Sequence, residues 1–160
     1  MKIIEQEEVR KLLQPKDCIQ LMAEALKGLE SGEYAQPARL ITVMPNTAKF
    51  GFMPAYVGDY FGAKVISAFA PNMGTKYPSH IGYVMLFESA HSTVAGMIEA
   101  GSITEIRTGA VSAAATDLLA RKDSHKLALI GAGAQARSHL AAIREIRDIT
   151  SVTVYDLFPQ

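Results

Sequence analysis

At 160 residues, with 49% hydrophobic and 20% charged content, the chain can build an ordinary globular core, and its composition excludes a disordered protein. Sixteen basic residues balance sixteen acidic ones, so no net field draws the chain toward nucleic acid or an anionic membrane. The N-terminus, MKIIEQEEVRKLL, has acids where a secretion signal needs apolar residues, and no apolar stretch approaches the roughly 20 residues of a membrane span. We therefore expect a cytoplasmic protein.

A first helix is predicted between Pro15 and Glu30, where apolar residues recur at helical spacing and Gly32 suits the stop. The single cysteine, Cys18, lies in this segment, so an internal disulfide is excluded. Its apolar neighbours favour a small core residue over a reactive thiol.

Short apolar runs cut by glycine, proline and asparagine follow between Gln36 and Glu99 and are typical of strands. The five runs are ARLITVMP, FGFMPAYV, FGAKVISAFAP, IGYVMLFES and STVAGMIEA. They follow one another too closely for parallel pairing, because a parallel pair needs a crossover of about a dozen residues or more. We expect a sheet of mainly antiparallel neighbours.

The pattern changes near Ser102, where Ser102 and Glu105 have capping-box spacing and predict the start of a second helix. This helix runs through RTGAVSAAATDLLARK, with Arg121 and Lys122 suited to its C-terminal end. The strand KLALIG, the helix QARSHLAAIREIR and the strand SVTVYD then give the order of a parallel crossover unit. The predicted fold class is α/β, with a mixed α+β domain over residues 1–102 and a β-α-β domain beginning at residue 103 and running to residue 160.

The turn Gly131-Ala132-Gly133-Ala134-Gln135-Ala136 matches G-x-G-x-x-A, follows an apolar strand and opens a helix, as in dinucleotide-binding domains. Its glycines allow the tight turn and the approach of a pyrophosphate, which the helix N-terminus can bind. Asp156 ends the second strand near the spacing of about 20 residues at which an acid accepts hydrogen bonds from the ribose. A carboxylate there repels a 2′-phosphate, which favours NAD over NADP. The alternative is a glycine turn without a nucleotide.

The stretches EIRTGAVSAAATDLLARKD and LALIGAGAQARSHL, with MPAY and GAKVIS upstream, resemble the ornithine cyclodeaminase and mu-crystallin family over nearly all of the chain. The resemblance implies a substrate-binding and dimerisation domain over residues 1–102, followed by the beginning of a Rossmann NAD-binding domain over residues 103–160. Family members are longer and are homodimers, so the chain resembles an N-terminal fragment. Their catalytic aspartate lies beyond residue 160, and we expect residues 1–160 alone to be inactive and to bind NAD weakly or not at all.

Three basic residues match the positions that hold the substrate carboxylate in this family: Arg39, Lys64 and Arg107. Lys64, which is also the expected catalytic residue, interrupts an apolar strand; the alternative is a lysine that reaches water from an edge strand. Arg39 also interrupts an apolar run, and the alternative is an ordinary surface arginine. Arg107 is expected in the first turn or so of its helix, where an anion would offset its unfavourable position, or else in an ion pair with Glu105 or Glu99.

The expected cofactor-binding residues are Ser79, Arg107, Thr108, Gly131, Gly133, Ala134, Gln135 and Asp156. The resemblance places Ser79 where the family commonly has a threonine that contacts the cofactor. The four histidines, His80, His91, His125 and His139, have no metal-ligand spacing, and no metal is expected. Phe52 precedes the M-P-A motif where many family members carry an acid, which leaves the identity of the substrate open.

The resemblance implies an NAD-dependent enzyme, and ornithine cyclodeamination is the leading expectation. In that reaction NAD takes a hydride from the substrate α-carbon, the imine loses ammonia on cyclisation, and the returned hydride gives proline. An alanine dehydrogenase or a ketimine reductase is the alternative with the same apparatus. A ligand-binding protein of the mu-crystallin kind, or a module that only dimerises, also stays open.

Overall fold

The computed structural model describes residues 1–158 and divides the chain into two compact units. The first comprises Met1–Lys11 and Ala25–Ser102, and the second comprises Leu12–Glu24 and the residues from Ile103 onward. The segment 12–24, which the sequence places with residues 1–102, thus groups with the second unit. None of the helices within residues 1–158 is long and apolar enough to cross a membrane.

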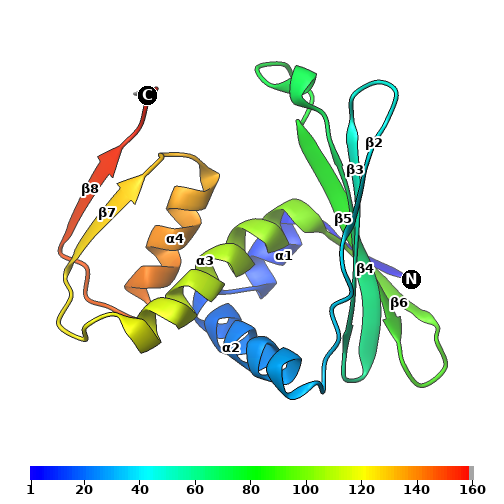
Figure 1. The fold of residues 1–160 in the computed structure, drawn as a ribbon, viewed down its shortest axis with the longest axis horizontal. Helices are drawn as coiled ribbons and strands as arrows, with labels where there is room; N and C mark the ends of the chain where they lie inside the picture. Colours follow the sequence, from blue (N-terminus) through cyan, green and yellow to red (C-terminus); the bar gives the residue numbers. More distant parts are fainter. Residues whose placement is uncertain (159–160) are drawn as a thin grey trace. The chain divides into compact units, whose positions relative to one another are not determined.

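The first unit is built on a six-stranded sheet with the strand order β1-β6-β5-β4-β3-β2 (Figure 1). Its strands are β1 (Lys2–Ile4), β2 (Leu40–Val43), β3 (Lys49–Val57), β4 (Tyr60–Ala68), β5 (His80–Glu88) and β6 (Val94–Glu99). Strands β2 to β6 pair antiparallel with their neighbours in sequence, which confirms the prediction from the five apolar runs. The tight β3–β4 turn uses Gly58 at φ +55°, a conformation that glycine adopts without strain.

Two further elements of this part of the chain were not predicted: β1 and the helix α1 (Gln6–Leu12). Strand β1 pairs in parallel with β6, a partner about ninety residues away, and its three residues are too few to show an alternating pattern. A one-turn 3-10 helix, η1 (Ala70–Asn72), lies in the loop between β4 and β5.

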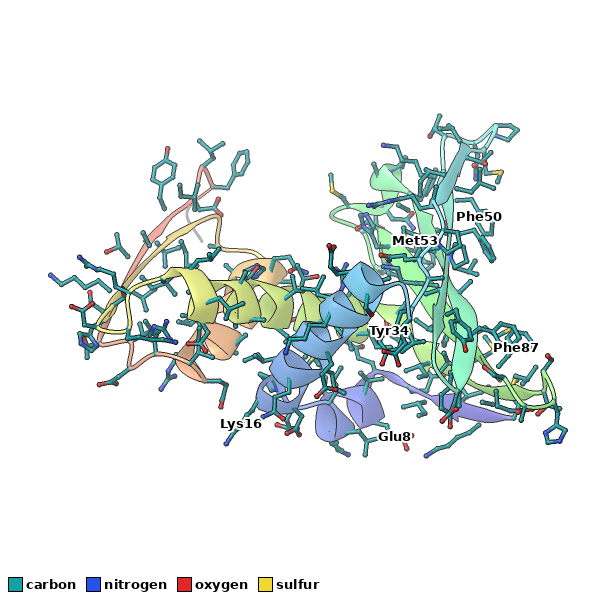
Figure 2. The ribbon with its side chains drawn as sticks, turned by 60° about the horizontal axis from the view of Figure 1, so that its bottom comes forward. Glu8, Lys16, Tyr34, Phe50, Met53 and Phe87 are labelled. Carbon is teal, nitrogen blue, oxygen red and sulfur yellow. The ribbon has the colours of Figure 1, made fainter. Side chains whose placement is uncertain are left out.

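Alternation along the strands gives the sheet two different faces. One face, here called the lysine face, presents Lys64 with Met53 and Val84 as its cross-strand neighbours. The opposite face, here called the aromatic face, presents Phe50, Phe52, Tyr56, Phe61, Val65, Ile81, Tyr83, Met85, Phe87 and Met97. Figure 2 shows Phe50 and Phe87 on one side of the sheet and Met53 on the other.

The aromatic face contains a stacked pair of rings, but many of its side chains remain partly exposed to solvent. The rings of Phe61 and Phe87 lie opposite each other on β4 and β5 and stack with centroids 5.3 Å apart. Phe50, Phe52 and Tyr56 are 41–43% exposed, and no apolar side chain of strands β1 to β6 is buried. A solvated face of an antiparallel sheet normally carries polar residues, so this face has the composition of a surface that another layer covers.

The second unit has the β-α-β order predicted from the sequence. Its elements are α2 (Pro15–Ser31), whose last turns belong to the first unit, α3 (Ala100–Leu119), β7 (Lys126–Ile130), α4 (Ala134–Arg144) and β8 (Ser151–Tyr155). Strands β7 and β8 pair in parallel, and α4 is the crossover between them (Figure 1). Ala113 on α3 packs with Ala142 and Ile143 on α4 to form a buried cluster, and Leu127 of β7 lies against it. Together with the sheet unit, this confirms the predicted α/β class.

The predicted capping box at Ser102 is wrong, because α3 begins two residues earlier, at Ala100. The carboxylate of Glu99, the last residue of β6, accepts hydrogen bonds from the N–H groups of Gly101 and Ser102. Glu99 therefore performs the capping that the sequence assigned to Ser102. The Ser102 hydroxyl is instead buried inside the helix and has no hydrogen-bond partner among residues 1–158.

Candidate functional site

Lys64 occupies the middle of the sheet and is half-buried on β4. Met53 on β3 and Val84 on β5 lie opposite it. The β2–β3 register, in which Leu40 faces Phe52, places Arg39 opposite Met53 when it is continued by one residue. Neighbouring strands are about 4.8 Å apart, so the backbones of Arg39 and Lys64 are about 10 Å apart on the lysine face. Side chains as long as arginine and lysine can reach a common anion across this distance.

The structure corrects one detail of the Arg39 prediction. Arg39 does not interrupt a strand; it precedes β2, which begins at Leu40, and its side chain is exposed. An exposed guanidinium keeps its hydration and does not need an acidic partner within the fold, so its location on the lysine face is compatible with a ligand-binding role and with a surface role.

Ser79 ends the loop between β4 and β5, directly before His80 begins β5. The loop is closed on itself, because the N–H of Phe69 donates to the carbonyl oxygen of Ser79 at 2.8 Å and Asn72 Nδ2 donates to the Pro78 carbonyl at 2.9 Å. The Ser79 hydroxyl lies 3.2 Å from His80 Nδ1. These contacts fix the hydroxyl at the end of the sheet where β4 finishes.

The glycine turn connects β7 to α4 in the second unit. Gly131 has φ +99°, a conformation that side chains disfavour, and Gly133 is the N-cap of α4 in an extended conformation. No side chain caps the helix, and a Cβ at either glycine would meet nothing within 4 Å. Ala134 and Gln135 open the helix and are exposed. The first N–H groups of α4 are therefore available to an anion, as the predicted pyrophosphate site requires.

Asp156 follows β8 and bonds directly to this turn. Its Oδ2 accepts a hydrogen bond from the N–H of Ala132 at 2.6 Å, and its Oδ1 accepts one from the N–H of Phe158 at 2.8 Å. The hydrogen bonds from Phe158 and Ala132 lower the pKa of the Asp156 carboxyl below its ordinary value. Each carboxylate oxygen keeps a second lone pair, so the predicted contact with a ribose hydroxyl is compatible with both bonds.

Arg107 and Thr108 lie on α3, two turns beyond its start at Ala100. The expectation that Arg107 occupies the first turn is wrong, so the helix dipole does not act strongly on it. Glu99 is engaged by the helix N–H groups. The hydroxyl of Thr108 donates to the Thr104 carbonyl one turn earlier, which leaves it able to accept a further hydrogen bond.

Helix α3 contacts the start of α4 at Gly109, where an added Cβ would lie 2.5 Å from the Ser138 carbonyl oxygen. Ser112 and His139 reinforce this contact, with the serine hydroxyl 2.9 Å from Nε2 and Nδ1 2.6 Å from the Gln135 carbonyl. Because a carbonyl only accepts, Nδ1 carries the proton and Nε2 accepts from Ser112. The helix that carries R-T-G-A-V-S therefore packs against the helix that G-A-G-A-Q-A opens, two turns from the glycine turn or less.

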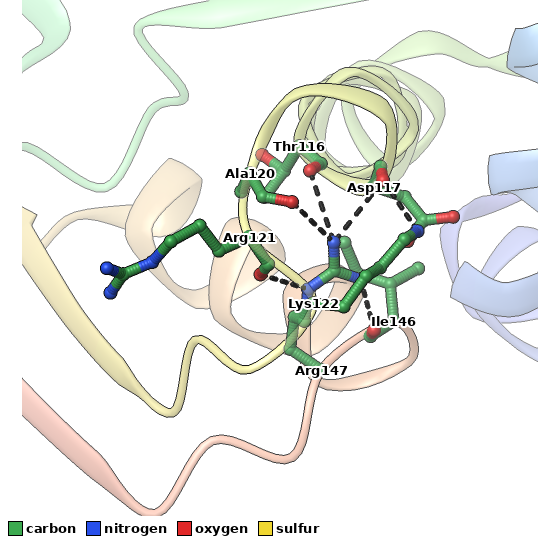
Figure 3. Close-up of polar contacts among 7 residues, drawn as sticks. All are labelled: Thr116, Asp117, Ala120, Arg121, Lys122, Ile146 and Arg147. Carbon is green, nitrogen blue, oxygen red and sulfur yellow. Dashed lines mark hydrogen bonds and ion pairs between the residues drawn. The ribbon is translucent and has the colours of Figure 1, made fainter.

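Sequence reasoning missed Arg147, which is the most heavily bonded side chain of the second unit (Figure 3). The side chain is 4% exposed, bonds the Asp117 carboxylate and donates to the carbonyls of Ala120, Arg121 and Ile146 at 3.2, 3.2 and 2.7 Å. Through the carbonyls of Asp117, in the last turn of α3, and of Ala120, just beyond its end, it satisfies acceptors near the point where the helix runs out of N–H groups. No periodicity or motif marks such a residue, because its partners lie about thirty residues away.

Lys122, expected to end α3, lies beyond the helix, and its Nζ bonds Asp117 Oδ1 at 2.8 Å. The hydrogen bonds from Arg147 and then from Lys122 hold the pKa of Asp117 below its ordinary value.

The predicted core position of Cys18 is confirmed, since the residue is 2% exposed. Burial raises the pKa of the Cys18 thiol, and the positive charge of the nearby Arg107 lowers it by a smaller amount. Within residues 1–158 no cluster of three or more His, Cys, Asp or Glu side chains is arranged to hold a metal ion.

Comparisons with known proteins agree with this geometry. The model of the ornithine cyclodeaminase/mu-crystallin family matches residues 1–160. Mouse ketimine reductase mu-crystallin is 35% identical over 127 residues, which cover 78% of this chain and 40% of that protein. The Thermococcus litoralis Delta(1)-pyrroline-2-carboxylate reductase, solved with NADH and L-proline, superposes with a TM-score of 0.92 at 33% identity, over 99% of this chain and 50% of that chain. An archaeal alanine dehydrogenase dimer with bound NAD gives a TM-score of 0.92 at 28% identity, over 97% and 48%.

The chain belongs to the ornithine cyclodeaminase/mu-crystallin family. This confirms the resemblance carried by its sequence motifs. The chain spans about half the length of the relatives it matches. Relatives in the family include NAD-dependent oxidoreductases that act on amino and imino acids.

Proposed function

We propose that the protein is an NAD-dependent oxidoreductase that acts at the α-carbon of a small amino or imino acid. The observation that carries this proposal is the turn between β7 and α4, whose open helix N-terminus and Asp156 contact suit a dinucleotide. The solved reductase with NADH and L-proline, similar over 99% of this chain, supports the same assignment.

The substrate carboxylate is assigned to Arg39, Lys64 and Arg107. Continued by one residue, the β2–β3 register puts Arg39 on the lysine face, two strands from Lys64 with Met53 between them, and two cations there neutralise a carboxylate more effectively than either alone. Arg107 joins this set by the family resemblance. Holding the carboxylate fixes the α-carbon that reacts, and such positioning supplies a large part of the rate of a reaction between two bound molecules. Lys64, central in the sheet, is the proposed catalytic residue.

The cofactor is assigned to the second unit and to Ser79. Gly131 provides the tight turn, Gly133, Ala134 and Gln135 offer backbone N–H groups to the pyrophosphate, and Asp156 accepts from the ribose. Ser79, Arg107 and Thr108 complete the proposed set. A nicotinamide cofactor held by these residues would supply hydride transfer to or from the substrate α-carbon. The Asp156 carboxylate repels a 2′-phosphate, so we propose NAD in preference to NADP.

Ornithine cyclodeamination is the form of this chemistry that the sequence alone favours. Reduction of a cyclic ketimine carboxylate is the second candidate, and one observation favours it. The relatives at 33% and 35% identity are reductases. Oxidative deamination of alanine uses the same residues.

We also propose that the protein is a homodimer through the aromatic face. This face carries ten large apolar side chains, several of them about 40% exposed, and a second copy would cover them with an identical layer. The archaeal alanine dehydrogenase to which this chain is similar is a dimer.

The test is a turnover assay of the full-length protein with three substrate and cofactor pairs. These are ornithine with NAD, alanine with NAD, and a cyclic ketimine carboxylate with NADH. We expect nicotinamide-dependent turnover with at least one pair. Absence of NAD(H)-dependent activity with all three would contradict the proposal.

A further inference from the structure

Asp156 receives two hydrogen bonds from two different segments. The N–H of Ala132 belongs to the glycine turn and bonds Oδ2 at 2.6 Å, whereas the N–H of Phe158 belongs to the chain after β8 and bonds Oδ1 at 2.8 Å. The carboxylate thus joins the cofactor turn to the end of the neighbouring strand.

The adjacent N–H of the turn is tied to the same strand end, because Gly131 donates to the Tyr155 carbonyl at 2.7 Å. Two successive N–H groups of the turn, those of Gly131 and Ala132, therefore already donate hydrogen bonds, one to the last residue of β8 and one to Asp156 directly after it. The N–H groups that follow, from Gly133 onward, belong to the open N-terminus of α4. The orientation of the anion-binding groups is set by these two bonds.

We propose that Asp156 is a positioning residue for the pyrophosphate-binding turn, in addition to its assigned contact with the ribose. This inference rests on the proposed cofactor site. The Asp156 carboxylate then has two roles. It accepts hydrogen bonds from the ribose hydroxyls, which distinguishes NAD from NADP, and it holds the conformation of the glycine turn, which binding of either cofactor requires.

The two roles predict opposite results for Asp156→Asn. If the carboxylate only repels the 2′-phosphate, its neutralisation raises the affinity for NADP. If it shapes the turn, asparagine fails, because it has one acceptor oxygen and its NH₂ group would face an N–H donor at either Ala132 or Phe158. Affinity for NADP then falls together with affinity for NAD.

The experiment is calorimetric titration of the full-length wild type, Asp156→Asn and Asp123→Asn with NAD and with NADP. Asp123 is the matched control, since its carboxylate lies in the same unit and is 78% exposed. We expect Asp156→Asn to lose roughly tenfold or more for both cofactors, the effect of one unsatisfied hydrogen-bonding group. We expect Asp123→Asn to match the wild type. A rise in NADP affinity in Asp156→Asn would overturn the inference.

A second measurement does not depend on ligand binding or on the folding of a variant. The amide resonance of Ala132 in the cofactor-free wild type should shift as Asp156 protonates, at a pH below the ordinary aspartate pKa of about 3.9, because the hydrogen bonds from Phe158 and Ala132 lower the pKa of Asp156. An Ala132 amide that does not respond overturns this inference alone. A wild type that binds neither NAD nor NADP contradicts the proposed function itself.

Discussion

The two units of the chain stabilise themselves in different ways. The β-α-β unit has a buried cluster of its own, with Ala113 and Ala142 at most 1% exposed and the Arg147 side chain enclosed by carbonyls. The sheet unit has no buried apolar side chain on any strand, and its aromatic face is left open. The candidate cofactor site of the β-α-β unit therefore depends on local contacts. The candidate carboxylate site of the sheet unit depends on strand register, in a sheet whose aromatic face lacks a covering layer.

This difference extends to the candidate site. The proposed cofactor-binding groups of the second unit lie within a few residues of one another along the turn, and the β7–β8 pairing brings Asp156 next to them. The proposed carboxylate-binding groups of the sheet unit come from β4 and from the residue before β2. Arg39 shares the lysine face with Lys64 when the β2–β3 register is continued by one residue. Substitutions in the sheet unit should therefore change turnover or dimerisation, whereas substitutions in the β-α-β unit should change its stability.

The largest effect is expected for Lys64→Ala. Removing the central ammonium leaves the substrate carboxylate without one of its partners, and we predict a fall in kcat/KM of about 100- to 1000-fold, or about 3–4 kcal/mol. Steady-state kinetics of the full-length protein with its best substrate measures this. Lys49→Ala is the matched control, because Lys49 lies on the same face at the first residue of β3. Equal losses in both variants would contradict a specific role for Lys64.

Next in size is the effect of Phe52→Lys on assembly. A lysine in the middle of the aromatic face would have to lose its hydration in a dimer, so we predict a rise in the dimer Kd of at least about 100-fold. Sedimentation equilibrium measures it. Met73→Lys is the control, since Met73 is 71% exposed in the loop between β4 and β5, outside the aromatic face. A Phe52→Lys protein that remains as dimeric as the control would assign the interface elsewhere.

Arg147→Met tests the other unit through its stability. Methionine fills the space without donating, so several carbonyls at the end of α3 lose a buried donor, and we predict a loss of about 3 kcal/mol in the free energy of unfolding. Urea denaturation measures the change. Arg121→Met, with its side chain 84% exposed, should cost about 0.5 kcal/mol or less. A similar small loss in both variants would show that the enclosed network is not stabilising.

The smallest effect concerns pH and Asp117. The hydrogen bond from Arg147 lowers the pKa of Asp117 in the folded state, so its contribution to stability is complete above the unfolded value of about 3.9 and is lost as pH falls through the lower folded value. Asp117→Asn should be less stable than the wild type at pH 7, and the gap should narrow below pH ~4. Thermal unfolding from pH 7 to pH 2 measures the two curves. Parallel curves over the whole range would contradict this origin of the shift.

The sequence predicted those parts of the fold that depend on short-range patterns. The glycine turn, the antiparallel runs and the helix ending near Gly32, at φ +79°, are all specified within a few residues. Strand β1 could not be predicted, because its parallel partner is β6. The start of α3 was misassigned because Glu99 and Ser102 are both residues that can cap a helix, and spacing alone does not show at which of them the helix begins.

The candidate site follows the same division. The location of the Gly131 turn was specified by its motif, whereas the bond between Asp156 and Ala132 depends on the pairing of β7 with β8. Arg39 and Lys64 were identified by residue type and resemblance, and their common face became visible only through the register. Arg147 gave no sequence signal because its partners belong to another helix.

The central proposal is that the lysine face binds the substrate carboxylate and thereby positions the substrate α-carbon for reaction with the nicotinamide. The most direct measurement is the rate of NADH oxidation by the full-length protein with a cyclic ketimine carboxylate and with the same ketimine lacking its carboxylate. We predict a rate at least about 100-fold higher with the carboxylate, the effect of one charged hydrogen-bonded pair. Equal rates with both compounds would contradict the account.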